Sequence, residues 1–254
     1  MPERHRTQGD KPSVQRYARA AGLLYLIIIV LGVVGEAVIR SSLIVWGDPA
    51  ATAQRILDAA LLWRMGIAGQ IVLLVCAVML TAIWYVLLRP VNRNLALALV
   101  CFGLVSLAVE SFCALHLQAA LTPLTSPALL KVATAQQLQL STYLAVVAHA
   151  ETFGLALIFF GVQCLLVGHL VRKSGYFPRA LGVMMQIVGV CYLINSFAMF
   201  LHPPLQHLLF PAILLPAFIG ESAMCLWLLI KGVDVTIWYG KLASGAASEI
   251  REAV

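Results

Sequence analysis

Six long apolar runs, separated by short polar or basic segments, dominate the sequence. A transmembrane helix needs about 20 mostly apolar residues, and six stretches meet that length. They are Ala20–Ile39, Arg64–Leu88, Leu95–His116, Tyr143–Leu170, Ala180–Leu201 and Leu208–Ile230. The pattern predicts an all-α fold, a polytopic membrane helix bundle of about six transmembrane helices. We divide the chain into a polar N-terminal segment (1–19), a transmembrane domain (20–233) and a C-terminal tail (234–254). The part of the tail after Trp238 and Tyr239 is small and polar, and we expect it to be loose.

The composition supports a membrane protein, and the basic residues predict its orientation. The chain has 254 residues, of which 61% are hydrophobic and 11% are charged, against roughly 45 to 50% and 25% in soluble domains. The net charge of +6 could suggest nucleic acid, but the basic residues lie in the connecting segments. Thirteen Lys and Arg fall on the side of the two termini and four on the other. Cytoplasmic loops carry the excess of Lys and Arg, so both termini are predicted to be cytoplasmic.

Two of the outer connections are predicted to be ordered. Asp48 can cap a short helix that starts at Pro49, and its apolar stripe would consist of Ile56, Leu57, Ala60 and Leu61. Ser126-Pro127 is expected to start a helix that continues into the fourth span, which would make that element longer than the bilayer is thick.

Small residues recur every seven positions in the fourth and fifth spans. If these spans form a tight antiparallel hairpin near Gly175, three pairs of small residues meet at matching depths. The pairs are Gly168/Gly182, Gly161/Gly189 and Gly154/Ser196. Small residues allow two helix backbones to approach closely, so this register is the predicted contact.

The apolar run 211–232 carries a single carboxylate, Glu221. A charged side chain at bilayer depth costs at least about 2.5 kcal/mol, so the group should be protonated, paired or facing a polar interior. Pro211 and Pro216 are expected to interrupt this helix and to free carbonyls near His207 and Ala212, as in helices that line cavities.

Further polar residues lie at bilayer depth in the other spans. Glu36 and Arg40 can form a local ion pair, whereas Glu110, like Glu221, has no basic residue within a turn of its own helix. His149 and Glu151 point about 200° apart on their helix, and we expect Glu151 to face inward. The candidate polar site comprises Glu221, Glu110, Glu151, Glu36, Asn195, Gln70, Arg64 and His149. We assign no catalytic residue, no metal ligand and no cofactor.

Cysteine and histidine patterns argue against a metal centre or a disulfide framework. All six cysteines fall in apolar runs without a CxxC pair, which predicts buried small side chains. The sequence contains no HExxH, GxSxG or phosphate-loop motif, so it favours a protein that is not an enzyme.

Several stretches resemble a bacterial family of integral membrane proteins named after a domain of unknown function, DUF4386. They are RAAGLLYLIIIVLGVVGE (19–36), LWRMGIAG (62–69), LLRPVNRNLAL (87–97), FFGVQCLLVGHLVRKSGYFPRALGVMM (159–185) and LPAFIGESAMCLWLLIKGV (215–233). The resemblance implies a six-span bacterial protein in the plasma (inner) membrane. It supplies no reaction, substrate or catalytic residue.

Three functions remain open from sequence. The preferred hypothesis is a protein that carries or senses a small solute or protons through an outward-facing polar cavity. In the first alternative, the buried carboxylates only hold helices together in a structural or interaction protein. The second alternative is an intramembrane metal-dependent enzyme. The expected partners are the lipid bilayer and a small solute or ion, without nucleic acid, and the sequence leaves the oligomeric state open.

Overall fold

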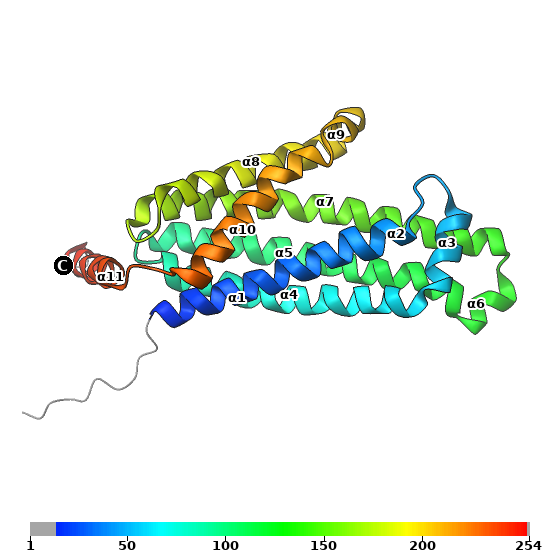
Figure 1. Ribbon diagram of the computed structural model, residues 1–254, viewed down its shortest axis with the longest axis horizontal. Coiled ribbons are helices and arrows are strands. Elements are labelled where there is room, and N and C mark those ends of the chain that lie inside the picture. Colours follow the sequence, from blue (N-terminus) through cyan, green and yellow to red (C-terminus); the bar gives the residue numbers. More distant parts are fainter. Residues whose placement is uncertain (1–13, 253–254) are drawn as a thin grey trace, which may run out of the picture.

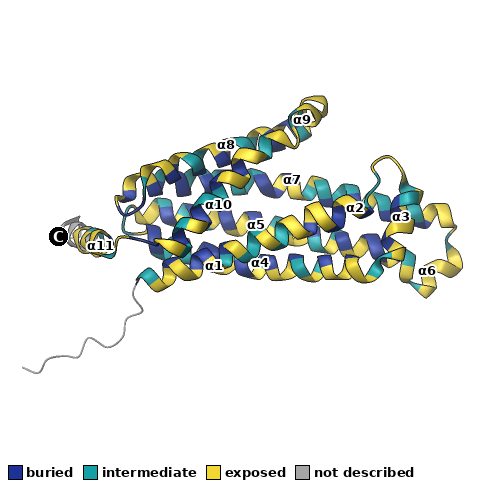
Figure 2. Cartoon of the chain, in the orientation of Figure 1, coloured by how far each residue is buried: buried dark blue, intermediate teal, exposed yellow. Residues whose placement is uncertain are grey.

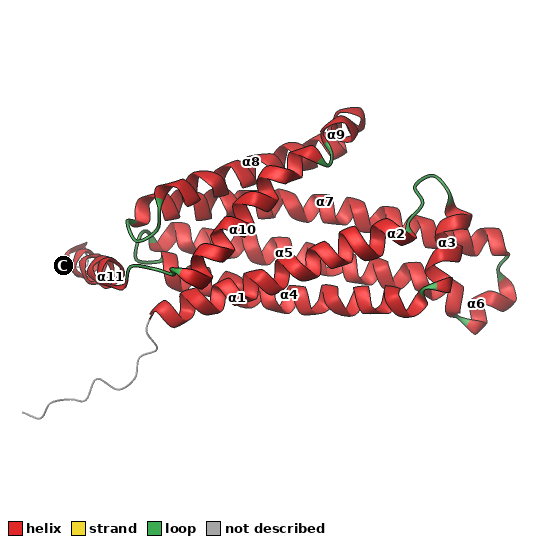
Figure 3. Cartoon of the chain, viewed as in Figure 1, coloured by secondary structure: helices red, strands yellow, loops and turns green. Residues whose placement is uncertain are grey.

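The computed structural model describes residues 14–252, in which every regular element is a helix (Figure 3). The predicted N-terminal segment lies outside the described residues as far as residue 13. The α-helices are α1 (Val14–Val33), α2 (Ser41–Leu43), α3 (Pro49–Asp58), α4 (Ala60–Leu88), α5 (Arg93–Thr125), α6 (Pro127–Val132), α7 (Ala135–Ser174), α8 (Arg179–Leu201), α9 (Pro203–Leu209), α10 (Leu215–Ile230) and α11 (Val235–Glu252). A π-helix, η1 (Val34–Arg40), and a 3-10 helix, η2 (Ala212–Leu214), complete the chain.

Six helical segments are long and apolar enough to cross a membrane, which confirms the predicted number. The first runs from Val14 to Leu43 through η1, and the fourth, α7, has 40 residues. A helix of that length spans roughly 60 Å, twice the hydrocarbon thickness, so α7 extends beyond the bilayer as predicted.

The predicted start of that element at Ser126 is wrong, because α6 and α7 are separate helices. Thr134 begins α7 with a capping box, in which Thr134 Oγ1 accepts from Gln137 N and Gln137 Oε1 accepts from Thr134 N. These two reciprocal hydrogen bonds satisfy backbone N–H donors at the start of α7. The capping box therefore fixes a new helix start at Thr134, separate from α6.

The six spans form a closed ring. Each packs against the next in the order α1, α4, α5, α7, α8 and α10, and α10 packs against α1. The described chain starts and finishes at the same end of the bundle, which we call the terminal end, and α3 and α6 lie at the opposite, distal end (Figure 1). Side chains that face inward from any of the six helices therefore meet in one interior.

The predicted glycine register is correct for two of its three pairs. A Cβ on Gly168 would lie 2.5 Å from the Gly182 carbonyl oxygen, and one on Gly161 would lie 3.0 Å from that of Gly189. The third pair is wrong, because Gly154 faces the side chain of Met199. At this depth a side chain, rather than the backbone of α8, lies against the glycine. Figure 1 shows that α8 diverges from α7 toward the distal end, which leaves room for that side chain.

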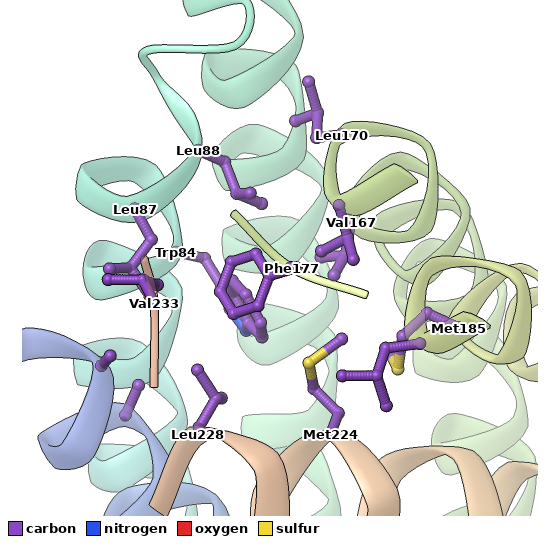
Figure 4. Close-up of a cluster of buried hydrophobic side chains, with 14 of the residues drawn as sticks. Trp84, Leu87, Leu88, Val167, Leu170, Phe177, Met185, Met224, Leu228 and Val233 are labelled. Atoms are coloured by element: carbon purple, nitrogen blue, oxygen red, sulfur yellow. The ribbon is translucent and has the colours of Figure 1, made fainter. Parts of the chain in front are cut away.

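A large hydrophobic core fills the terminal half of the ring. Phe177, from the connection between α7 and α8, lies among Trp84, Val167 and Leu228 (Figure 4). Side chains from all six spans belong to this cluster, so the terminal end of the bundle is packed with apolar groups.

The C-terminal tail is helical, so the prediction of a loose tail is wrong. Figure 1 shows α11 nearly end-on, with its axis across the bundle. Trp238 is buried, and its indole Nε1 donates to the Leu87 carbonyl at 3.0 Å. The Tyr176 hydroxyl donates to the same oxygen at 2.6 Å. Because the last carbonyls of a helix lack partners within it, the end of α4 offers acceptors that hold the tail in place.

A smaller hydrophobic cluster lies at the distal end, where α3 crosses the bundle. Asp48 Oδ1 accepts from Ala51 N at 2.9 Å, which confirms the predicted cap. The predicted stripe is correct for Ile56, which is buried, and for Ala60, which packs against this cluster, and it is wrong for Leu57 and Leu61, which are exposed. The buried face of α3 consists of Thr52, Ala53 and Ile56. The chain breaks after Asp58, so Ala60 and Leu61 belong to α4.

The predicted interruption of the last span is confirmed at Pro211, between α9 and η2. Pro216 lies in the first turn of α10, where its missing N–H is not needed, and the Ala212 carbonyl accepts from Leu215 N. The predicted free carbonyl at Ala212 is therefore wrong. No residue of α9 or η2 is buried (Figure 2).

Four of the six cysteines are buried as predicted, and all six are free thiols. Cys101 is exposed and Cys191 is half-buried, so the prediction is wrong for these two.

Candidate functional site

Glu221 forms a polar contact between α10 and α8. The Tyr192 hydroxyl donates to Glu221 Oε1 at 2.8 Å. Tyr25 of α1 and Cys164 of α7 are both buried in the hydrophobic core against which Tyr192 packs. We call these four residues the Glu221 cluster. It draws on four helices of the ring and borders the hydrophobic core of the terminal half.

The residue before Glu221 explains why the carboxyl reaches α8. A Cβ on Gly220 would lie 2.5 Å from Val188 Cγ2, so α10 can approach α8 closely only because position 220 has no side chain. Tyr192 follows Val188 by one turn on α8, and its long side chain reaches Glu221. The close approach of α10 to α8 at Gly220 thus brings Glu221 within hydrogen-bonding distance of Tyr192.

A second group of polar residues lies nearer the distal end. Arg40 Nε donates to Glu36 Oε2 at 2.7 Å, which confirms the predicted ion pair. Gln70 Nε2 donates to Glu110 Oε1 at 2.9 Å and joins α4 to α5. Glu110 and His149 of α7 make no direct ion pair with Arg40 but lie within range of its charge. We call Glu36, Arg40, Gln70, Glu110 and His149 the Arg40 cluster.

The π-helix places Arg40 inside the bundle. Two consecutive residues, Ile39 and Arg40, are buried at the end of η1, while Glu36 is exposed. Gly35 leaves room for the guanidinium, since a Cβ at that position would lie 3.3 Å from Arg40 Nη1. Single π-helical turns occur frequently at functional sites.

His149 is the inward residue of its pair, so the expectation that Glu151 faces inward is wrong. His149 is buried and its Nδ1 lies 3.2 Å from the Cys113 carbonyl oxygen, whereas Glu151 is exposed. Gly154 already faces Met199, close to the end of α8 at Leu201. Glu151 lies about one turn further toward the distal end, where α8 no longer covers α7.

The remaining predicted residues do not join either cluster by a hydrogen bond or ion pair within residues 14–252. Arg64 is exposed on α4. Asn195 is buried on α8, and its Oδ1 has no hydrogen-bond partner among the described residues. Ser196 Oγ and Thr142 Oγ1 are likewise buried without a partner there. An unpaired buried polar group costs about 1 to 3 kcal/mol, so these atoms mark places where water or a ligand would be stabilising.

The two tyrosines and Cys164 of the Glu221 cluster were not predicted from the sequence. A signal for Tyr192 exists, because it shares one face of α8 with Val188 and Asn195 at spacings of three and four residues. Tyr25 shows no such signal, because its neighbours in sequence are apolar on every side. Its place in the cluster follows from the packing of α1 against α10.

The two clusters offer several kinds of chemistry. Carboxyl and hydroxyl oxygens at Glu110, Tyr192 and Glu221 can accept or donate protons and can bind cations. The guanidinium of Arg40 can bind an anionic group. Among residues 14–252, no three His, Cys, Asp or Glu side chains lie close enough together to hold a metal ion, so the metal-enzyme alternative has no geometric support.

Comparisons with known proteins identify a family and state no activity. The model of a family defined by a domain of unknown function (DUF4386) matches residues 20–232. An uncharacterized protein of Archaeoglobus fulgidus (strain ATCC 49558 / DSM 4304 / JCM 9628 / NBRC 100126 / VC-16) is 28% identical over 166 residues, which are 65% of this chain and 83% of that protein. No solved structure matches the chain.

Proposed function

The chain belongs to the DUF4386 family, which is defined by a domain of unknown function, and has the six apolar helices of a multi-pass membrane protein; we propose that it carries or senses a small solute or protons. The proposal places a polar cavity at the two clusters and opens it to the outside of the cell. It also places the protein in a bacterial plasma membrane with both termini in the cytoplasm.

The distribution of polar and apolar groups along the bundle carries this proposal. The terminal half is filled by a hydrophobic core to which all six spans contribute. Toward the distal end the ring loosens: α8 diverges from α7, and α9 and η2 bury no residue (Figure 2). Glu110 and Glu221 lie between these regions and are each partly exposed. A solute would therefore reach them more easily from the distal end.

Charge supports the proposed orientation. The connections at the terminal end carry Arg89, Arg93, Arg172, Lys173 and Arg179, whereas the distal connections contain few basic residues. Short loops rich in Lys and Arg stay in the cytoplasm, so the distal end would face outward.

A structural role is the second candidate, and two hydrogen bonds favour it. Gln70 and Glu110 join α4 to α5, and Tyr192 and Glu221 join α8 to α10. Hydrogen bonds between membrane helices contribute about 0.6 to 2 kcal/mol each, which is enough to fix helix positions. In this reading the carboxyls need no ligand.

The variant Glu221→Gln separates the two functions. Glutamine keeps the shape and an oxygen that can accept from Tyr192 but has no titratable proton. If Glu221 binds a cation or moves protons, the purified variant should fold like the wild type but lose the dependence of its melting temperature on pH or on the bound solute. Thermal-shift measurements across ions, small solutes and pH values provide this comparison.

Glu221→Leu is the matched control, because it also removes the hydrogen bond. Under the structural reading Glu221→Gln should be silent, and Glu221→Leu should destabilise the protein by about 1 to 3 kcal/mol. A wild-type protein that responds to no solute or proton, together with a silent Gln variant, would eliminate the proposed function.

A further inference from the structure

Arg40 is a buried cation with an unused hydrogen-bonding edge. Its side chain is 10% exposed, and its Nε donates to Glu36. Its two terminal nitrogens donate to no group among residues 14–252, although a guanidinium carries five N–H donors in a fixed fork. The two terminal nitrogens are not among the fully buried atoms that lack a partner in residues 14–252, so this edge is open to an incoming group, and two parallel donors match the two oxygens of a carboxylate. The free edge of Arg40 is therefore suited to an anionic group with paired oxygens.

The surroundings of that edge limit which anion can bind. Glu110 on α5 lies beyond ion-pair distance of Arg40, yet the two charges interact. Gln70 on α4 donates to one oxygen of Glu110, which leaves the other oxygen available to a ligand. His149 on α7 also lies within the electrostatic range of Arg40.

A simple anion would be repelled by ionised Glu110, and a simple cation would leave the free edge of Arg40 without an acceptor. A molecule that carries both charges meets both needs and brings no net charge into the interior. We propose that the Arg40 cluster binds a small zwitterion of the α-amino acid type, with its carboxylate on Arg40 and its ammonium on Glu110. This inference rests on the proposed function and names the class of its solute.

The predicted roles differ for the two ends of the ligand. The planar guanidinium forms two parallel bonds to a carboxylate, which lysine cannot reproduce. The carboxylate of Glu110 supplies a charge for the ammonium, and glutamine supplies only a neutral oxygen. Glu36 acts as a positioning residue, because its ion pair with Nε holds the Arg40 side chain and leaves the two terminal nitrogens uncommitted.

Binding to the purified full-length protein tests the assignment, with calorimetry and thermal shift as readouts. The probes are glycine and L-alanine as zwitterions, and acetate and methylammonium as molecules that carry only one of the two charges. We expect the zwitterions to bind more tightly than either single-charge probe. Arg40→Lys and Glu110→Gln should each weaken zwitterion binding by about tenfold or more, since each removes one charged contact.

Glu151→Gln is the matched control, because Glu151 lies at a similar depth but is exposed and outside the cluster. Its zwitterion affinity should equal that of the wild type. Arg40→Lys keeps a positive charge that can pair with Glu36. If this variant does not fold, Glu110→Gln still tests the site, at the ammonium end of the ligand.

Two outcomes overturn the inference. One is a wild-type protein that binds neither zwitterion with a Kd of about 1 mM or tighter. The other is zwitterion binding that survives in both Arg40→Lys and Glu110→Gln. If zwitterions fail while another solute or pH still acts through Glu221, the inference falls and the proposed function stands. If nothing in the wider screen acts and Glu221→Gln is silent, both fall.

Discussion

Tyr192 and Glu221 place a hydroxyl donor and a carboxyl acceptor 2.8 Å apart between two membrane helices. Tyr192 has polar neighbours one turn away on its own helix, Asn195 and Ser196, yet its hydroxyl donates to Glu221 on another helix. The contribution of such a hydrogen bond to the free energy of unfolding has been measured in other membrane proteins. Double-mutant cycles in membrane proteins give about 0.6 kcal/mol on average for such contacts, with values up to about 2 kcal/mol.

A double-mutant cycle of Tyr192→Phe and Glu221→Leu measures this coupling. Each single variant breaks the hydrogen bond and leaves one half-buried polar group unpaired, whereas the double variant leaves none. The double variant should therefore be more stable than the sum of the two single effects predicts, by about 0.6 to 2 kcal/mol. Unfolding in mixed detergent supplies the free energies. Effects that add to within about 0.3 kcal/mol would show that the two side chains do not interact.

Sequence alone indicated which polar residues are anomalous but could not indicate their partners. Glu110 and Glu221 stand out because each lies in an apolar run without a nearby cation. Their partners, Gln70 and Tyr192, come from other helices, and the pairing depends on helix rotation and depth. Glu151 is another example, since the sequence could not show whether it or His149 faces the interior of the bundle. That depends on where α8 ends.

At the scale of the elements, the sequence predicted the features that depend on residues close together in the chain. The Asp48 cap, the break at Pro211 and the six spans follow from residues adjacent in sequence, and each is confirmed. The helical tail was not predictable in this way. Most residues after Tyr239 are small or polar, and α11 is held by the distant contact between Trp238 and the end of α4.

The contact between α7 and α8 yields a sharp prediction about packing. A Cβ on Gly168 would lie 2.5 Å from the Gly182 carbonyl oxygen, and backbone atoms cannot yield as a side chain can. Gly168→Ala should therefore cost about 1 to 3 kcal/mol through overpacking. The control is Gly69→Ala, whose Cβ would meet Leu31 Cδ2 at an ordinary 3.7 Å. Equal stability of the two variants in a thermal unfolding assay would contradict the close approach of α7 and α8.

At the scale of the whole molecule, the closed ring divides the protein into two unlike ends. Apolar side chains from every span meet at the terminal end, and α11 lies across it. At the distal end the chain uses short helices and a smaller cluster, and the Arg40 cluster lies beneath them. A bundle packed solid at one end and looser at the other can admit a solute from one side while remaining closed on the other.

The orientation of this asymmetry in the membrane is the last prediction, and it follows from the basic residues. Asn92 and Gly175 lie at the terminal end, at the start of α5 and the end of α7. Gly47 and Ala133 lie in distal connections, and Ala133 is a better fusion point than a residue within α5, which continues to Thr125. Alkaline phosphatase, which is active only outside the cytoplasm, should be inactive when fused after Asn92 or Gly175 and active after Gly47 or Ala133. The opposite pattern at all four sites would invert the protein and direct the Arg40 cluster to the cytoplasm, while a mixed pattern would remove a span from the ring.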